Sequence, residues 1–189
     1  MRKTLPLLVL FLCNIVFANA QFYKTLRRDD SFSDSLGRIV YDFKNNFYPI
    51  QGRQLTSEGT VDVFESTISM PGSANCVIQR YHSDEDTSAS WQAIMYEGDS
   101  YAEATKIYKN TFKQLKKAKL KFDDNRVASF TGDIELPNES VRFTVTTLRL
   151  NIMDRDYKNF YAVVEISNNF AGWEVHLNLY NKKNDGEQY

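Results

Sequence analysis

Two segments of this sequence have apolar residues at helical spacing, and each is followed by shorter segments with the character of β-strands. The first apolar stripe recurs at helical positions: Leu36, Ile39, Val40, Phe43 and Phe47. The second stripe lies between about Tyr101 and Lys119: Ala104, Ile107, Tyr108, Thr111, Leu115 and Ala118. This order favours an α+β fold in which an antiparallel sheet carries both helices on one face.

Both expected helices have recognisable ends. Ser31 or Ser33 can cap the first helix, and Pro49 should end it because proline disfavours the helical region before it. The second helix should begin after Ser100, where Glu103 completes the Ser-x-x-Glu pattern of a capping box.

The remaining segments are rich in β-branched and aromatic residues and are separated by turn signals such as Pro71-Gly72. Three strands are expected between the helices, at 60–70, 74–81 and 88–96. Four more are expected afterwards, at 126–136, 140–150, 160–167 and 173–180, the last two forming a hairpin.

The two halves share a pattern at an offset of 66 residues, where four positions are identical: Val61/Val127, Phe64/Phe130, Ile68/Ile134 and Pro71/Pro137. We therefore expect two αβββ-like repeats, at 31–97 and 100–167, and an extra C-terminal strand at 172–181. A pseudo-two-fold arrangement around a central strand pair would relate the two repeats.

The first 20 residues have the features of a secretory signal peptide. Arg2 and Lys3 precede an apolar run, and Ala18-Asn19-Ala20 is a small-x-small cleavage site. The apolar run is shorter than the ~20 residues that a membrane span needs, so no transmembrane segment is expected. We expect export to the periplasm or the medium, a single domain at 21–183 and a frayed tail at 184–189.

The chain resembles the small exported αβββ-type proteins of Bacteroidetes-like bacteria. The resemblance rests on the Phe-Ala-Asn-Ala-Gln end of the signal and on the stretch from Tyr101 to Lys116. The helix-then-strands order is also similar to secretion-chaperone folds, which is an architectural likeness and implies no activity.

The composition and motifs argue against several function classes. The chain has 23 Lys+Arg against 24 Asp+Glu, and loss of Arg2 and Lys3 makes it more acidic, so nucleic acid is not an expected partner. There is no HExxH, CxxC or Gly-x-Ser-x-Gly motif, so no catalytic residue, metal ligand or cofactor is predicted. Cys76 lies in an apolar run and is interpreted as a small buried hydrophobe. The loop at 82–87 is interpreted as a solvated acidic turn.

Strand alternation predicts the candidate site. In the second half, the residues expected to face the core are Val141, Phe143, Val145, Phe160, Ala162, Val164, Ile166, Trp173, Val175, Leu177 and Leu179. The opposite alternation collects charged and aromatic side chains on the outer side. Those predicted to bind a ligand are Arg142, Tyr161, Glu165, His176 and Tyr180.

The sequence therefore favours an exported, non-catalytic binding or accessory protein whose partner is a protein or a small molecule. One alternative is an extracytoplasmic hydrolase, for which Glu165 and Glu174 on neighbouring strands are an available carboxylate pair. The other is a structural protein that associates with itself through exposed strand edges.

Overall fold

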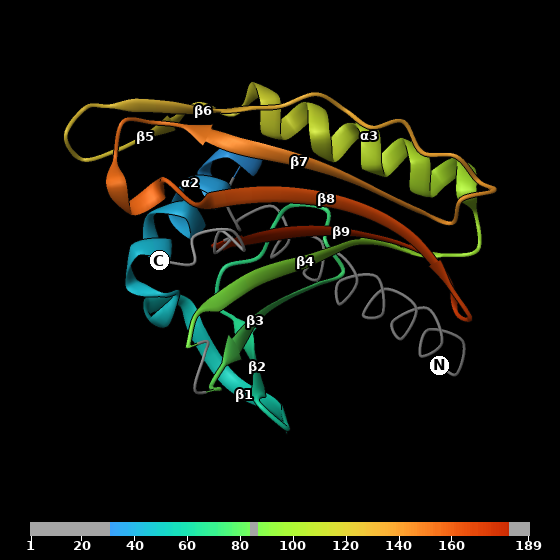
Figure 1. Ribbon diagram of the computed structural model, residues 1–189, viewed down its shortest axis with the longest axis horizontal. Helices are drawn as coiled ribbons and strands as arrows, with labels where there is room; N and C mark the ends of the chain where they lie inside the picture. The colour runs from blue at the N-terminus through green and yellow to red at the C-terminus, as the bar shows by residue number, and fades with distance from the viewer. Residues whose placement is uncertain (1–30, 84–86, 182–189) are drawn as a thin grey trace, which may run out of the picture. The chain divides into compact units, whose positions relative to one another are not determined.

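The computed structural model describes residues 31–83 and 87–181, and the predicted signal peptide and frayed tail lie outside these ranges. Strands are the commonest regular structure in the described chain, and two α-helices accompany them (Figure 1). The helices are α2 (Phe32–Asp42) and α3 (Tyr101–Lys117). The strands are β1 (Gln51–Glu58), β2 (Val61–Ser66), β3 (Asn75–Tyr81), β4 (Ala89–Gly98), β5 (Leu120–Lys121), β6 (Val127–Thr131), β7 (Phe143–Asn151), β8 (Phe160–Asn169) and β9 (Gly172–Asn181).

The strands form one nine-stranded sheet in the order β1-β2-β3-β4-β9-β8-β7-β6-β5, and all its neighbouring strands run antiparallel. The last strand, β9, lies between β4 and β8 (Figure 1). The predicted extra C-terminal strand is therefore at the centre of the sheet, where it joins the two halves of the chain.

The first half has one strand more than expected. β1 has the sequence QGRQLTSE, with Leu55 as its one aliphatic residue, and six of its eight residues are exposed. An edge strand needs no apolar face to pair with its neighbour, so this segment lacked the signal that identified the other strands. In the second half β6 is shorter than expected and ends at Thr131, before Gly132 adopts a φ of 153°.

The first helix ends earlier than Pro49 predicts. α2 stops at Asp42, a 3₁₀ turn follows from Phe43 to Asn45, and Asn46 and Phe47 both have left-handed backbones, with φ of 51° and 59°. Phe47 still reaches the core, where it is fully buried. The Asn46 side chain holds this reversal against the sheet by donating to the Thr87 carbonyl and accepting from the Ala89 N–H.

The capping box of the second helix is replaced by a different arrangement. Ser100 Oγ accepts a hydrogen bond from the Glu103 N–H, as expected. The Ser100 N–H, however, donates to the hydroxyl of Tyr96, and this hydroxyl donates in turn to the Glu103 carboxylate. The full capping box is found instead at α2, between Ser31 and Asp34.

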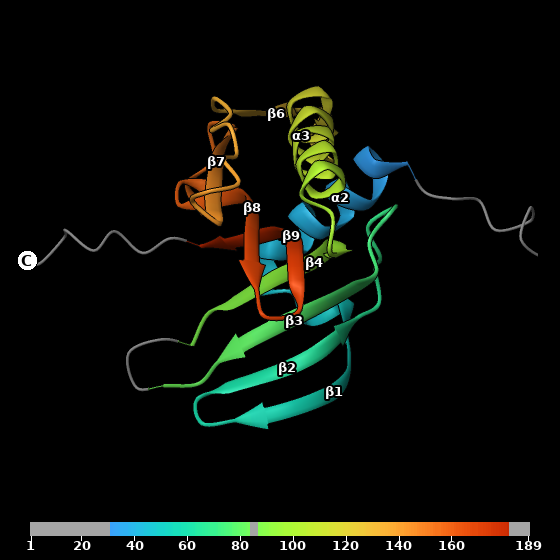
Figure 2. The ribbon, with the colours of Figure 1, turned by 90° about the vertical axis from the view of Figure 1, so that its right-hand side faces the viewer.

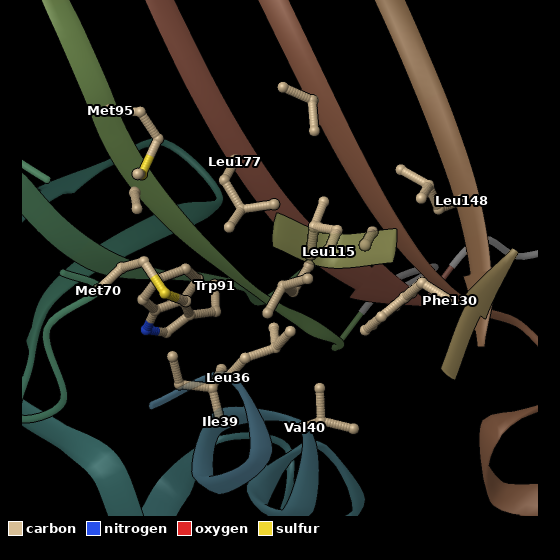
Figure 3. Packing of buried hydrophobic residues seen from close by; sticks show 14 of the residues in the cluster. Leu36, Ile39, Val40, Met70, Trp91, Met95, Leu115, Phe130, Leu148 and Leu177 are labelled. Carbon is tan, nitrogen blue, oxygen red and sulfur yellow. The ribbon is translucent and has the colours of Figure 1, made fainter. Parts of the chain in front are cut away.

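The core combines residues of the helices and the strands. Leu36 and Ile39 of α2 lie beside Trp91 of β4 (Figure 3), and Val40 belongs to the same buried cluster. Leu115 of α3 belongs to the same buried cluster. α3 contacts β4, β6, β8 and β9, whereas α2 contacts β5 and the end of α3, beside which it lies in Figure 2.

An aromatic group closes one end of this core. Tyr157, in the loop between β7 and β8, lies within 6.0 Å of the ring centres of Phe43, Phe122 and Phe160. Its hydroxyl donates to the carbonyl of Val40, 117 residues away in the chain. Within residues 31–83 and 87–181, no helix has the length and apolar character to cross a membrane.

Candidate functional site

The outer face of the sheet is the side of β3, β4, β9, β8 and β7 whose residues alternate with the buried core residues. Tyr161 of β8 lies opposite Tyr180 of β9, and Glu165 lies opposite His176. Four of the five predicted site residues are therefore adjacent on two neighbouring strands. On β4 and β3 the outer face continues with Ser90, Gln92, Ile94, Val77, Gln79 and Tyr81.

The predicted placement of Arg142 on the outer strand face and the predicted orientation of β7 are both wrong. Arg142 precedes β7 and has a left-handed backbone with φ of 60°. Val141 and Phe143, expected in the core, are 60% and 53% exposed, while Thr146, Leu148 and Leu150 are buried. Val145, also expected in the core, lies opposite Glu165 and so belongs to the outer face.

Thr146 can be buried on the core side of β7 because its hydroxyl forms hydrogen bonds there. It shares a hydrogen bond with Tyr108 Oη of α3 and accepts one from the Glu135 N–H. A buried hydroxyl with two partners has a small desolvation cost. The reversed orientation brings Arg149 to the outer face, opposite Tyr161, with its guanidinium carbon 5.3 Å from the ring centre.

His176 stands at the centre of a polar cluster. Its Nε2 lies 2.8 Å from Glu174 Oε2, and the other oxygen of Glu174 accepts from Asn169 Nδ2 at 2.6 Å. Two hydrogen bonds lower the pKa of Glu174 below its ordinary value: the one from the Asn169 amide has the larger effect, and the one with His176 the smaller. Glu165 of β8 is the register partner of His176 on the neighbouring strand.

The two tyrosines are largely covered despite lying on the outer face. Tyr161 is 8% exposed, packed under Arg149. Burial, and then the charges of Tyr161 and Glu165, raise the pKa of Tyr180 above its ordinary value, so its phenol is neutral at physiological pH.

A hollow of about 350 Å³ opens on the outer face beside Tyr180, over β3, β4 and β9. The alternation of β3 and β4 was not used in predicting the site, so this region was missed from the sequence. Its described lining residues are amides, hydroxyl-bearing residues and one alanine: Gln79, Tyr81, Ser88, Ala89, Ser90, Gln92, Asn178, Tyr180 and Asn181.

The other candidate groups have structural partners. Cys76 is buried, and burial raises the pKa of its thiol, which contacts Ser73 Oγ and the Met70 N–H. His82 Nε2 lies 3.1 Å from the Gly59 carbonyl, and residues 84–86 of its loop lie outside the described residues. In the described part of the chain, no group of three or more His, Cys, Asp and Glu side chains could hold a metal ion.

Comparison with known protein families, with curated proteins and with solved structures gave no match. Function is therefore argued from the geometry of the outer face alone.

Proposed function

We propose that this chain is an exported, non-catalytic binding protein that acts through the outer face of its sheet. The observation that carries the proposal is the continuous row of Arg149, Tyr161 and Tyr180 across β7, β8 and β9, with the His176 cluster beside it. Arginine and tyrosine are the side chains that most often anchor binding interfaces.

The proposal includes both helices packing on the face opposite this row. Leu36 of α2 and Leu115 of α3 share one buried cluster with Trp91 and Leu177, which lie on the other side of β4 and β9. This arrangement would leave the outer face without a covering helix and available to a partner.

We also propose that the halves are repeats. Each half begins with a helix and ends with a long strand, and these two strands, β4 and β9, pair antiparallel. A two-fold axis between them would relate β2 to β7, whereas the sequence offset relates β2 to β6. Comparing hydrogen-exchange protection of β2, β6 and β7 would decide which pairing holds.

The export part of the proposal rests on the sequence of residues 1–20. Its test is N-terminal sequencing of the mature protein, which should begin at Gln21. A protein that retains Met1 in a membrane fraction would contradict it.

The non-catalytic part is supported by the partners of the nucleophile and base candidates. His176 pairs with Glu174, and His82 lies against a backbone carbonyl and, at 3.9 Å, the carboxylate of Asp62. The raised pKa of Cys76 disfavours the thiolate that a cysteine nucleophile needs.

The binding surface is tested by recovering partners from the exported fraction with immobilised protein. Arg149→Ala should reduce recovery at least tenfold, whereas Arg142→Ala, which removes an exposed arginine that lies off the strand face, should not. Equal recovery by both variants would reject the outer face as the binding surface.

A further inference from the structure

The hollow on the outer face has the shape of a trough along β4. Because β4 lies between β3 and β9, the small side chain of Ser90 lies at the floor, and Ser88, just before β4, lines one end. Longer side chains rise on both sides, from Gln79 and Tyr81 on β3 and from Tyr180 on β9. Its volume of about 350 Å³ falls within the ~300–1,000 Å³ typical of small-molecule sites.

Three amides form a hydrogen-bonded chain across this trough. Gln79 Nε2 donates to Gln92 Oε1 at 3.5 Å, and Gln92 Nε2 donates to Asn178 Oδ1 at 2.8 Å. These two bonds use neither the amide oxygen of Gln79 nor the amide nitrogen of Asn178. The trough therefore presents an acceptor at one end of the chain and a donor at the other, oriented by the amide between them.

The described lining of the trough is uncharged, which is unusual for a surface in a chain with 25% charged residues. No Lys, Arg, Asp or Glu is among its described lining residues, and the Tyr180 phenol is neutral at physiological pH, as tyrosines ordinarily are. A charged ligand would lose its hydration there without gaining an ion pair. The site therefore favours a neutral ligand.

The backbone around the trough is already paired. β4 is hydrogen-bonded to β3 on one side and to β9 on the other, so an extended peptide cannot add to it as a further strand. Recognition must come from side chains, which here are amides and hydroxyls for a ligand's polar groups and tyrosine rings for its apolar faces.

From these features we propose that the trough over β3, β4 and β9 binds a neutral saccharide through Gln79, Gln92, Asn178, Tyr81 and Tyr180. Sugar hydroxyls donate and accept, as the amides do, and the C–H face of a sugar ring packs on a phenol. The inference rests on the proposed function in taking the outer face as the binding surface, and it names the ligand class.

The test is calorimetric titration of the whole exported chain with glucose, N-acetylglucosamine and cellobiose, and with glucuronate and glucosamine as charged probes. At least one neutral sugar should bind with a Kd of about 1 mM or tighter. The charged probes should bind at least tenfold more weakly. No binding by any neutral sugar, or preference for a charged probe, would overturn the inference.

Two variants locate the site independently. Ser90→Leu fills part of the trough beside Gln79 and keeps all three amides, whereas Gln92→Leu removes the central amide at similar volume. Each should raise the Kd at least tenfold. Thr147→Leu is the matched control. Thr147 is an exposed outer-face residue of β7 that lies opposite Val163 of β8, and it does not line the trough. This variant should change the Kd less than twofold.

Thermal melting of each variant separates loss of the site from loss of the fold. If Gln92→Leu melts much earlier than the wild type, Ser90→Leu alone decides, because it keeps all three amides. Unchanged binding by a folded Ser90→Leu would overturn the proposal. If no sugar binds but Arg149→Ala still reduces partner recovery, this inference alone is rejected. If a neutral sugar binds but Arg149→Ala leaves partner recovery unchanged, the proposed partner surface alone is rejected.

Discussion

Arg149 of β7 lies directly opposite Tyr161 of β8, and its guanidinium carbon is 5.3 Å from the centre of the phenol ring. This distance is within the range of a cation–π contact. The contact places a fixed positive charge on the outer face at the point where the tyrosine row begins. Tyr161 itself is only 8% exposed, although it lies on the side of β8 that faces away from the core.

The contact predicts different costs for the two arginines. Arg149→Ala should lower the free energy of unfolding by about 0.5–1 kcal/mol, the usual value of an exposed cation–π pair. Arg142→Ala should change it by less than about 0.5 kcal/mol, because that side chain is exposed and lies before the strand. Urea denaturation of both variants measures the difference, and a larger cost at Arg142 would mean that β7 was assigned the wrong face.

The orientation of β7 shows where sequence reasoning reached its limit. Threonines at 144, 146 and 147 fit either side of a strand, so alternation alone does not decide which residues are buried. The deciding contact is the hydrogen bond between Thr146 and Tyr108, which comes from a helix 38 residues earlier. β9, in contrast, alternates strictly, and all the residues of β8 and β9 that were predicted to face the core are buried. β8 also buries Tyr161 and Val163 on its other side, which alternation did not predict.

The candidate site was predictable to the same extent. The sequence located the hairpin of β8 and β9 but left its register open, and the structure supplies the facing pairs Tyr161/Tyr180 and Glu165/His176. The trough does not follow in this way, because it combines β9 with β3 and β4, and strand order between distant segments leaves no local pattern. β1 was missed for a different reason, since an exposed edge strand needs no apolar alternation.

Tyr157 offers a test of the contact between α2 and the β7–β8 loop. Tyr157→Phe should cost about 0.5–1.5 kcal/mol, because it leaves the Val40 carbonyl without its hydroxyl donor and keeps the ring. Tyr157→Ala should cost about 3–5 kcal/mol through loss of the buried aromatic packing. Tyr48→Phe is the control and should have little effect, since Tyr48 is 62% exposed and its ring still stacks under Arg80.

Gly172 opens β9 with a φ of 124°, and a Cβ there would lie 2.8 Å from the Gly98 carbonyl oxygen. Gly172→Ala should therefore destabilise the fold by about 2 kcal/mol or more, through backbone strain together with the clash. Gly59→Ala is matched in backbone handedness, but nothing lies near its added methyl group, so it should cost only about 1 kcal/mol. Equal costs in guanidinium denaturation would mean that the β4–β9 junction is looser than described.

The thiol of Cys76 should be protected in the folded protein. Burial raises its pKa, so little thiolate forms at pH 8, and the side chain is 5% exposed. With Cys13 replaced by serine in the full chain, Ellman's reagent should label Cys76 at least a hundredfold more slowly in buffer than in denaturant. Labelling at comparable rates would show that the β3 side of the core opens readily.

Glu174 gives the stability of the fold a defined dependence on pH. Its pKa is lowered in the folded state, first by the Asn169 amide and then by His176, so the folded chain favours the carboxylate more than the unfolded chain does. The stabilisation is present above the ordinary pKa of a glutamate and is lost as the pH falls through the lowered folded value. Glu174→Gln should therefore be less stable than the wild type at neutral pH, and the difference should shrink as the pH falls below about 4.3.

Urea midpoints measured from pH 7 to pH 3 test this, with Glu58→Gln on the exposed edge strand as the control. A difference that stays constant with pH would mean that Glu174 stabilises the hairpin by shape and not by charge.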